Sequence, residues 1–193
     1  MSNIIIAGPG RSGKTTLARH FINKGFNHYK MDSIKRGIDN NFIDYSIPYW
    51  KCSSKMCYLI KTIIDEAKSD LTYNQSLIID TCHIYPSDVI KYNLDNEIIV
   101  FVGYPNILEF NKFMNIRNND LDNIWTSKLN DQELFEYIKN GILYSKEIEN
   151  ECIKYNLPFF DISCDFDNKL NEIINYINDK IDSKKKIKND KFL

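Results

Sequence analysis

Short apolar runs alternate along the chain with longer segments in which apolar residues recur every three or four positions. The apolar runs predict β-strands at residues 3–7, 77–79, 97–102 and 158–162, and residues 28–31 look like a second, short strand. The helical spacing predicts helices at residues 14–23, 54–67, 107–113, 134–155 and 170–181. The strands are continuously apolar, which is typical of a parallel sheet covered on both faces. The pattern therefore predicts an α/β fold with three layers, α/β/α, in a single domain over residues 1–193.

Two polar segments interrupt this alternation. Residues 33–50 are polar and aromatic, and they predict a short helix followed by a loop. Residues 115–130 are polar with little periodicity, and we expect them to form a mobile loop or lid. Trp125 is the apolar anchor of that segment.

Composition and charge narrow the functional classes. Of the 193 residues, 43% are hydrophobic, which is enough for a packed core, and the formal net charge is -1. This charge argues against a broad nucleic-acid-binding face. The five cysteines form no C-x-x-C pair, so we expect reduced thiols rather than a metal site or disulfides. No apolar run approaches the roughly 20 residues of a membrane span, and the apolar run at 4–7 is too short for a signal core. We expect a cytoplasmic protein without nucleic-acid or membrane partners.

A complete phosphate-binding motif follows the first predicted strand. The residues that match G-x-x-x-x-G-K-[ST] are Gly8, Pro9, Gly10, Arg11, Ser12, Gly13, Lys14 and Thr15. Backbone N–H groups of such a loop surround phosphate oxygens, and the N-terminus of the following helix adds its positive dipole. We expect Lys14 to reach the β- and γ-phosphates of ATP, Thr15 to bind Mg²⁺, and Thr16 to complete the cofactor site. The alternative, a glycine-rich turn that binds nothing, does not account for the strand–loop–helix context.

Asp80 ends the third apolar run, so its carboxylate should emerge at the carboxyl edge of the sheet, where such folds bind ligands. This is the Walker-B position, whose acid holds the Mg²⁺ shell. The alternative is an aspartate that merely begins a loop. The nearby phosphate motif favours the metal role.

The motifs of a GTPase are incomplete. A D-x-x-G switch requires glycine three residues after Asp80, where the chain has His83. Asn111 and Lys112 begin an N-K-x-D motif, but Met114 replaces its aspartate. A GTPase is therefore improbable.

The order of these features resembles the nucleoside-monophosphate-kinase-like, or adenylate-kinase-like, family of P-loop kinases. The resemblance covers nearly the whole chain, although the phosphate loop is its only highly specific motif. It implies a five-stranded parallel sheet of order 2-3-1-4-5 and a P-loop NTPase fold. It also implies an acceptor site beside strand two, and a lid whose arginines contact ATP.

The resemblance places three residues on the acceptor side. Asp32 occupies the position of a carboxylate that faces the acceptor, where it accepts or hydrogen-bonds the acceptor's hydroxyl proton; it is equally typical of a helix N-cap. Arg36, with Lys35 beside it, lies near the position of a phosphate-binding arginine. The alternative is a solvent-exposed basic residue on a short helix. His83 either binds acceptor or is an ordinary loop histidine.

The lid of such kinases usually carries several arginines, and here Arg117 is its single arginine. We expect Arg117 to stabilise charge on the transferring phosphoryl group, with Lys128 as a weaker substitute. This shortage of arginines puts a nucleotide acceptor in doubt. An aromatic group (Tyr45, Tyr49 and Trp50) either lines an acceptor pocket or packs in the core.

The sequence thus predicts a kinase, monomeric or homodimeric, that transfers the γ-phosphoryl group of ATP with Mg²⁺ to a small hydroxyl-bearing molecule. Two alternatives stay open: a non-catalytic ATP-binding switch, and a 5′-hydroxyl polynucleotide kinase, which the near-neutral charge disfavours.

Overall fold

The structure is a computed structural model that describes residues 2–41, 53–69, 75–119 and 125–190. The strands are β1 (Ile4–Ala7), β2 (Asn27–Lys30), β3 (Leu77–Thr81), β4 (Ile98–Gly103) and β5 (Phe159–Asp161). The α-helices are α1 (Lys14–Ile22), α2 (Met31–Asn41), α3 (Ser53–Ser69), α4 (Pro86–Lys91), α5 (Glu109–Asn119), α6 (Asp131–Tyr155) and α7 (Phe166–Asp190). Two 3-10 turns are η3 (Leu94–Asn96) and η4 (Trp125–Lys128).

The five strands form a parallel sheet in the order β2-β3-β1-β4-β5, which confirms the predicted architecture. Ile6 of β1 pairs with Asp80 of β3 on one side and with Val100 of β4 on the other. Every residue of β1, β3 and β4 is buried, because helices cover both faces of the sheet.

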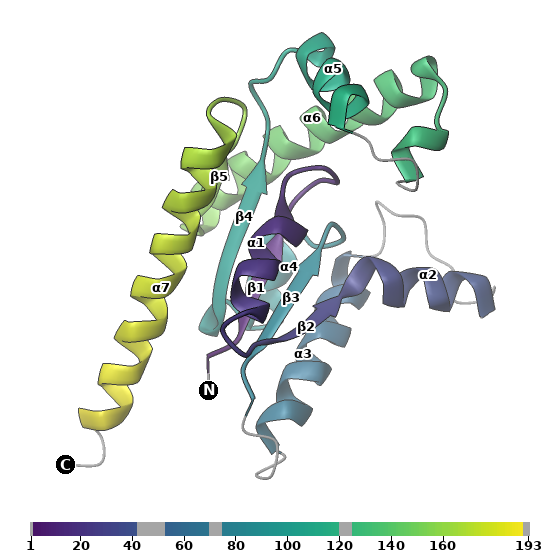
Figure 1. Ribbon diagram of the computed structural model, residues 1–193. Coiled ribbons are helices and arrows are strands. Elements are labelled where there is room, and N and C mark those ends of the chain that lie inside the picture. Colours follow the sequence, from purple (N-terminus) through teal and green to yellow (C-terminus); the bar gives the residue numbers. More distant parts are fainter. Residues whose placement is uncertain (1, 42–52, 70–74, 120–124, 191–193) are drawn as a thin grey trace.

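Helices α1 and α7 cover one face of the sheet, and α3 and α4 cover the other (Figure 1). Ile6 belongs to the first core, together with Phe21 of α1 and Ile173 of α7. Ile5 points to the opposite face and packs in the second core with Ile60 of α3. Successive residues of a strand face opposite ways, so one apolar run serves two cores.

Helix α6 joins the two cores and begins three residues before its predicted start. The side chain of Asn130 accepts a hydrogen bond from the backbone N–H of Glu133 (2.9 Å), and Glu133 accepts one from the backbone N–H of Asn130 (2.9 Å). This capping box sets the first turn of α6. Asn156, with φ 53°, ends the helix in the left-handed conformation.

Other predicted boundaries differ from the observed ones. Helix α5 continues through residues 115–119, which we expected to be irregular, because Ile116 buries its side chain in the first core. Helix α7 is longer at both ends than the predicted 170–181. Helix α4 was not predicted, because its six residues are too few to show a period. The aromatic group of Tyr45, Tyr49 and Trp50 lies outside the described residues.

Candidate active site

The phosphate loop connects β1 to α1 at the carboxyl edge of the sheet, as Figure 1 shows. Gly13 precedes α1 with φ 80°, and a Cβ at this position would lie 2.8 Å from the ring of Phe166. Only glycine meets both conditions without strain. The backbone N–H of Gly8 donates to the carbonyl of Thr81 (3.2 Å), which ties the loop to the end of β3.

Two side chains of the loop, Lys14 and Ser12, are buried against it. The ammonium of Lys14 donates to the carbonyl of Pro9 (2.6 Å), and the side chain is almost completely buried. Ser12 is fully buried, and within the described residues its hydroxyl has no hydrogen-bond partner. A buried hydroxyl without a partner is costly unless a ligand satisfies it, so the loop fits an oxygen-rich ligand. Thr16 is exposed in the first turn of α1.

Thr15, in the first turn of α1, contacts Asp80 of β3. The hydroxyl of Thr15 donates to Asp80 Oδ2 (2.9 Å), and Asp80 is 1% exposed. His28 Nε2 on β2 lies 3.3 Å from the same carboxylate oxygen. A hydroxyl and a carboxylate are the oxygen ligands that Mg²⁺ takes, and a cation here would offset a buried negative charge. The two predicted metal ligands therefore fit Mg²⁺.

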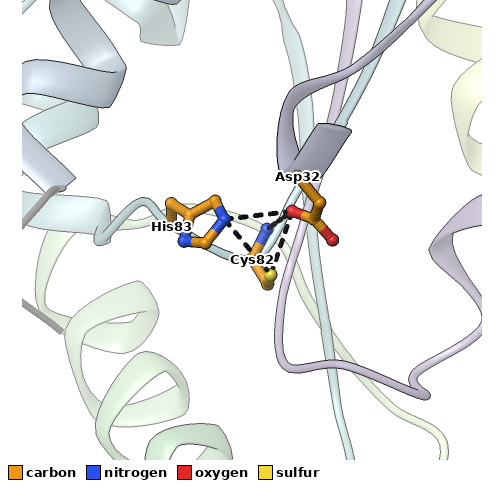
Figure 2. Close-up of side chains that lie close together, drawn as sticks. All are labelled: Asp32, Cys82 and His83. Atoms are coloured by element: carbon orange, nitrogen blue, oxygen red, sulfur yellow. Dashed lines mark hydrogen bonds and ion pairs between the residues drawn. The ribbon is translucent and has the colours of Figure 1, made fainter. Parts of the chain in front are cut away.

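Asp32 lies in the first turn of α2, and its carboxylate contacts the segment after β3 (Figure 2). Its Oδ1 accepts from the backbone N–H of Cys82 (3.4 Å) and from the Cys82 thiol (3.0 Å), and it lies 3.2 Å from His83 Nε2. His83 is buried, with 3% of its surface exposed. The structure therefore joins two of the predicted acceptor-side residues directly.

The Asp32 carboxylate is held in its ionised form. Burial raises the pKa of Asp32, but the hydrogen bond from His83, the charge of Lys14 and the hydrogen bond from Cys82 outweigh this effect. They hold the pKa well below its usual range. A carboxylate of this kind is a weak base and a good hydrogen-bond acceptor.

The other predicted cations lie in different surroundings. Arg36 is exposed on α2, and its neighbour Lys35 pairs with Asp39 one turn later. Arg117 donates to the carbonyl of Leu129 (2.8 Å) and to the carboxylate of Asp131 (2.8 Å). Arg117 thereby links α5 to the start of α6. Lys128 is exposed in η4.

Three residues that sequence reasoning missed, Lys112, Tyr104 and Tyr137, contact the phosphate loop. Lys112 of α5 donates to the carbonyl of Arg11 (2.9 Å), and its ammonium lies 4.2 Å from the centre of the Tyr104 ring. The hydroxyl of Tyr104 donates to the carbonyl of Gly10 (2.9 Å). A Cβ on Gly10 would clash with the hydroxyl of Tyr137, from α6. In sequence, Lys112 stood out only as part of an incomplete GTPase motif, so no signal marked this contact.

Lys112 is an unusual lysine because it is 7% exposed. Burial, and then the charges of Arg11 and Lys14, lower the pKa of Lys112 to about 8. The phosphate loop thus gathers three cationic side chains, which suits a polyanionic ligand.

A hollow of about 490 Å³ opens at the carboxyl end of β5. It is lined by Asn106, Phe159, Phe160, Asp161, Ser163, Cys164, Lys169 and Glu172. Helix α7, which follows this connection, begins at Phe166, whose ring packs on Gly13 of the phosphate loop. Within the described ranges, none of the helices combines the length and apolar character needed to cross a membrane.

Comparison with known proteins extends the fold assignment. The sequence matches no family model, and it matches no curated protein. The structure is similar to a shikimate kinase from Bacteroides thetaiotaomicron, with a TM-score of 0.56, 14% identity, and coverage of 94% of this chain and 98% of that one. It is also similar to a gluconokinase from Sinorhizobium meliloti 1021, with a TM-score of 0.58, 11% identity, and coverage of 94% of both chains. These likenesses show that the chain has the fold of P-loop kinases.

Proposed function

We propose that this protein is a kinase that transfers the γ-phosphoryl group of ATP, with Mg²⁺, to a hydroxyl group of a small molecule. The observation that carries the proposal is the hydrogen bond of 2.9 Å between Thr15 and Asp80, directly below a complete phosphate loop. The names of the two similar structures, a shikimate kinase and a gluconokinase, support a small-molecule acceptor.

The phosphate loop binds and orients the triphosphate. Its backbone N–H groups surround the β-phosphate, and Lys14 exchanges the Pro9 carbonyl for phosphate oxygens. Thr15 and Asp80 would hold Mg²⁺, which would neutralise charge on the triphosphate. The hollow beside β5 accommodates the base.

Asp32 orients the acceptor. The hydroxyl oxygen of the acceptor forms a bond to the γ-phosphorus while the bond from that phosphorus to the bridging oxygen of ADP breaks. Phosphoryl transfer through a loose transition state needs little proton removal before this step. An ionised Asp32 therefore accepts a hydrogen bond from the hydroxyl, takes its proton as the new bond forms and releases that proton to solvent. Arg36 and His83 complete the acceptor side.

Residues 115–130, of which 120–124 lie outside the described residues, act as the lid, and Arg117 approaches the transferring group when the lid closes. Its present partner Asp131 has a side chain that is 75% exposed. An ion pair of this kind is worth at most about 1 kcal/mol. Exchange for phosphate would also replace the hydrogen bond from Arg117 to the carbonyl of Leu129.

The test measures transfer of labelled γ-phosphate from ATP to a panel of sugars, sugar acids, hydroxylated carboxylic acids, nucleosides and nucleotides. We expect a labelled product in at least one class, and loss of that product in the Asp80→Asn variant. ATP binding that depends on Mg²⁺ without transfer across the panel would contradict the kinase and favour the non-catalytic switch.

A further inference from the structure

Three different metal-ligating atoms converge beside the phosphate loop, from the first turn of α2 and the segment after β3 (Figure 2). Asp32 Oδ1 lies 3.0 Å from Cys82 Sγ and 3.2 Å from His83 Nε2, and those two atoms are 3.8 Å apart. Cys82 and His83 are buried, whereas the Asp32 side chain is 32% exposed. A metal ion could therefore reach the three ligand atoms only through the partly exposed side chain of Asp32, because Cys82 and His83 are buried.

The triangle is close to the size that a tetrahedral metal requires. Zn²⁺ bonds of about 2.3 Å to sulfur and about 2.0 Å to nitrogen or oxygen place neighbouring ligands about 3.3 to 3.6 Å apart. The distances between Cys82, His83 and Asp32 differ from these values by about 0.6 Å at most. Small side-chain rotations would supply this change without a movement of the backbone.

The backbone that carries two of the ligands is already fixed. The N–H of His83 donates to the hydroxyl of Thr81 (3.1 Å), and the N–H of Tyr85 donates to the hydroxyl of Ser53 (2.8 Å). The hydroxyl of Tyr144 donates to the carbonyl of Ile84 (2.9 Å). A preorganised segment loses little conformational freedom when it binds a metal.

The ligand types select the metal. Sulfur and imidazole nitrogen favour Zn²⁺ and related transition metals, whereas Mg²⁺ prefers oxygen and keeps its water. A Cys82 thiolate and an Asp32 carboxylate together balance the charge of a divalent cation. On binding, the Cys82 thiol releases its proton to solvent, and a bond to the metal replaces its hydrogen bond to Asp32.

We propose that Asp32, Cys82 and His83 form a binding site for a thiophilic divalent cation such as Zn²⁺, distinct from the Mg²⁺ site at Thr15 and Asp80. The bound ion engages the Asp32 carboxylate, so the metal site and the acceptor hydroxyl exclude each other. This second statement rests on the proposed function, whereas the metal site itself does not.

Co²⁺ added to the reduced, metal-free full chain is the first probe, because a cobalt–thiolate bond gives a near-ultraviolet charge-transfer band. We expect one Co²⁺ per chain, displacement by Zn²⁺ and no displacement by excess Mg²⁺. Cys82→Ser should abolish the band, and His83→Gln should weaken Zn²⁺ binding by at least about tenfold. Cys164→Ser, which changes an exposed thiol elsewhere, should leave the band intact.

The site would be overturned if the parent showed no thiolate band. It would also be overturned if the band survived Cys82→Ser or disappeared in Cys164→Ser. Circular dichroism checks that each variant is folded, and Cys82→Ala serves if the serine variant is not. Lys14→Ala should keep the band, which separates the metal site from the kinase proposal.

Where phosphoryl transfer is observed, Zn²⁺ should inhibit it reversibly in the parent and not in Cys82→Ser. Metal binding without inhibition would overturn the competition with acceptor and leave the metal site standing.

Discussion

Lys14, Asp80 and Lys112 share one property at the scale of single residues: each is a charged side chain that is almost completely buried. Burial of charge is costly unless partners or a ligand compensate for it. The two lysines donate to carbonyls of the phosphate loop, and Asp80 accepts from Thr15. Under the proposed function, these three charges would serve the triphosphate and its metal rather than the stability of the ligand-free protein.

Lys14→Ala should reduce ATP turnover by at least about a hundredfold while the protein stays folded, because Lys14 serves phosphate and its partner Pro9 carbonyl lies in a loop. Steady-state turnover and the melting temperature measure the two effects. Lys139→Ala, at an exposed position on α6, is the matched control. Undiminished turnover of a folded Lys14→Ala protein would remove this residue from the phosphate site.

Lys112 should make stability depend on pH. Its pKa of about 8 in the folded protein lies below the ordinary 10.5, so the folded state binds fewer protons between these values than the unfolded state does. The free energy of unfolding should therefore rise with pH across this window, by at most about 3 kcal/mol from this group. Urea unfolding of the parent and of Lys112→Met, from pH 7 to 9.5, should show this slope in the parent alone. Lys139→Met should behave as the parent, and parallel curves for the parent and Lys112→Met would refute the effect.

At the scale of elements, α5 and α6 form the part of the fold that contacts the phosphate loop from outside the sheet (Figure 1). Arg117 on α5 pairs with Asp131 at the start of α6, and the capping box of Asn130 begins that helix. Ile116 of α5 and Thr126 of η4 are buried and anchor this part of the chain. The described residues of this region thus combine these buried positions with exposed polar ones such as Asn118 and Lys128, which supply little apolar area for packing.

The predicted lid, residues 115–130, should exchange its amide hydrogens more slowly when ATP and acceptor are both bound, and less so with ATP alone. Closure excludes water and brings Arg117 to the phosphates, so the effect needs both substrates. Hydrogen exchange followed by mass spectrometry measures it, with α3 as an internal reference. Slow exchange already in the free protein would mean that the segment is fixed and that Arg117 has another role.

At the scale of the whole molecule, much of the fold followed from local sequence patterns. The buried strands have no polar residue before their ends, so the apolar runs located them, and the resemblance to P-loop kinases gave their order. The phosphate loop and Asp80 could be proposed from sequence because their chemistry is local to one loop and one strand end. The contacts of Lys112, Tyr104 and Tyr137 with the loop could not be found, because they join segments about 100 residues apart without a periodic signal.

Asp80→Asn should separate the stability of the ligand-free protein from its stabilisation by ligand. The amide removes a buried negative charge, so the ligand-free melting temperature should be unchanged or higher. The stabilisation by Mg²⁺ and ATP, about 2.7 kcal/mol at a hundredfold excess over Kd, should fall. Thermal melts with ATP, with and without Mg²⁺, test this, and equal stabilisation and equal turnover of both proteins would exclude Asp80 from the metal site.

The close approach of Tyr137 to Gly10 has a consequence for how this chain tolerates sequence change. Gly10 has no positive φ, so its backbone accepts alanine; what forbids a methyl group there is the Tyr137 hydroxyl. The two positions should therefore show epistasis. Gly10→Ala should weaken nucleotide binding and stability in the parent, and Tyr137→Phe should restore part of the loss by removing the obstructing oxygen. A double-mutant cycle should give a coupling free energy of about 0.5 to 3 kcal/mol, and strictly additive effects would show that the loop moves away from α6 at no cost. A glycine of the phosphate motif would then be dictated partly by a helix that begins more than 100 residues later, and not by phosphate alone.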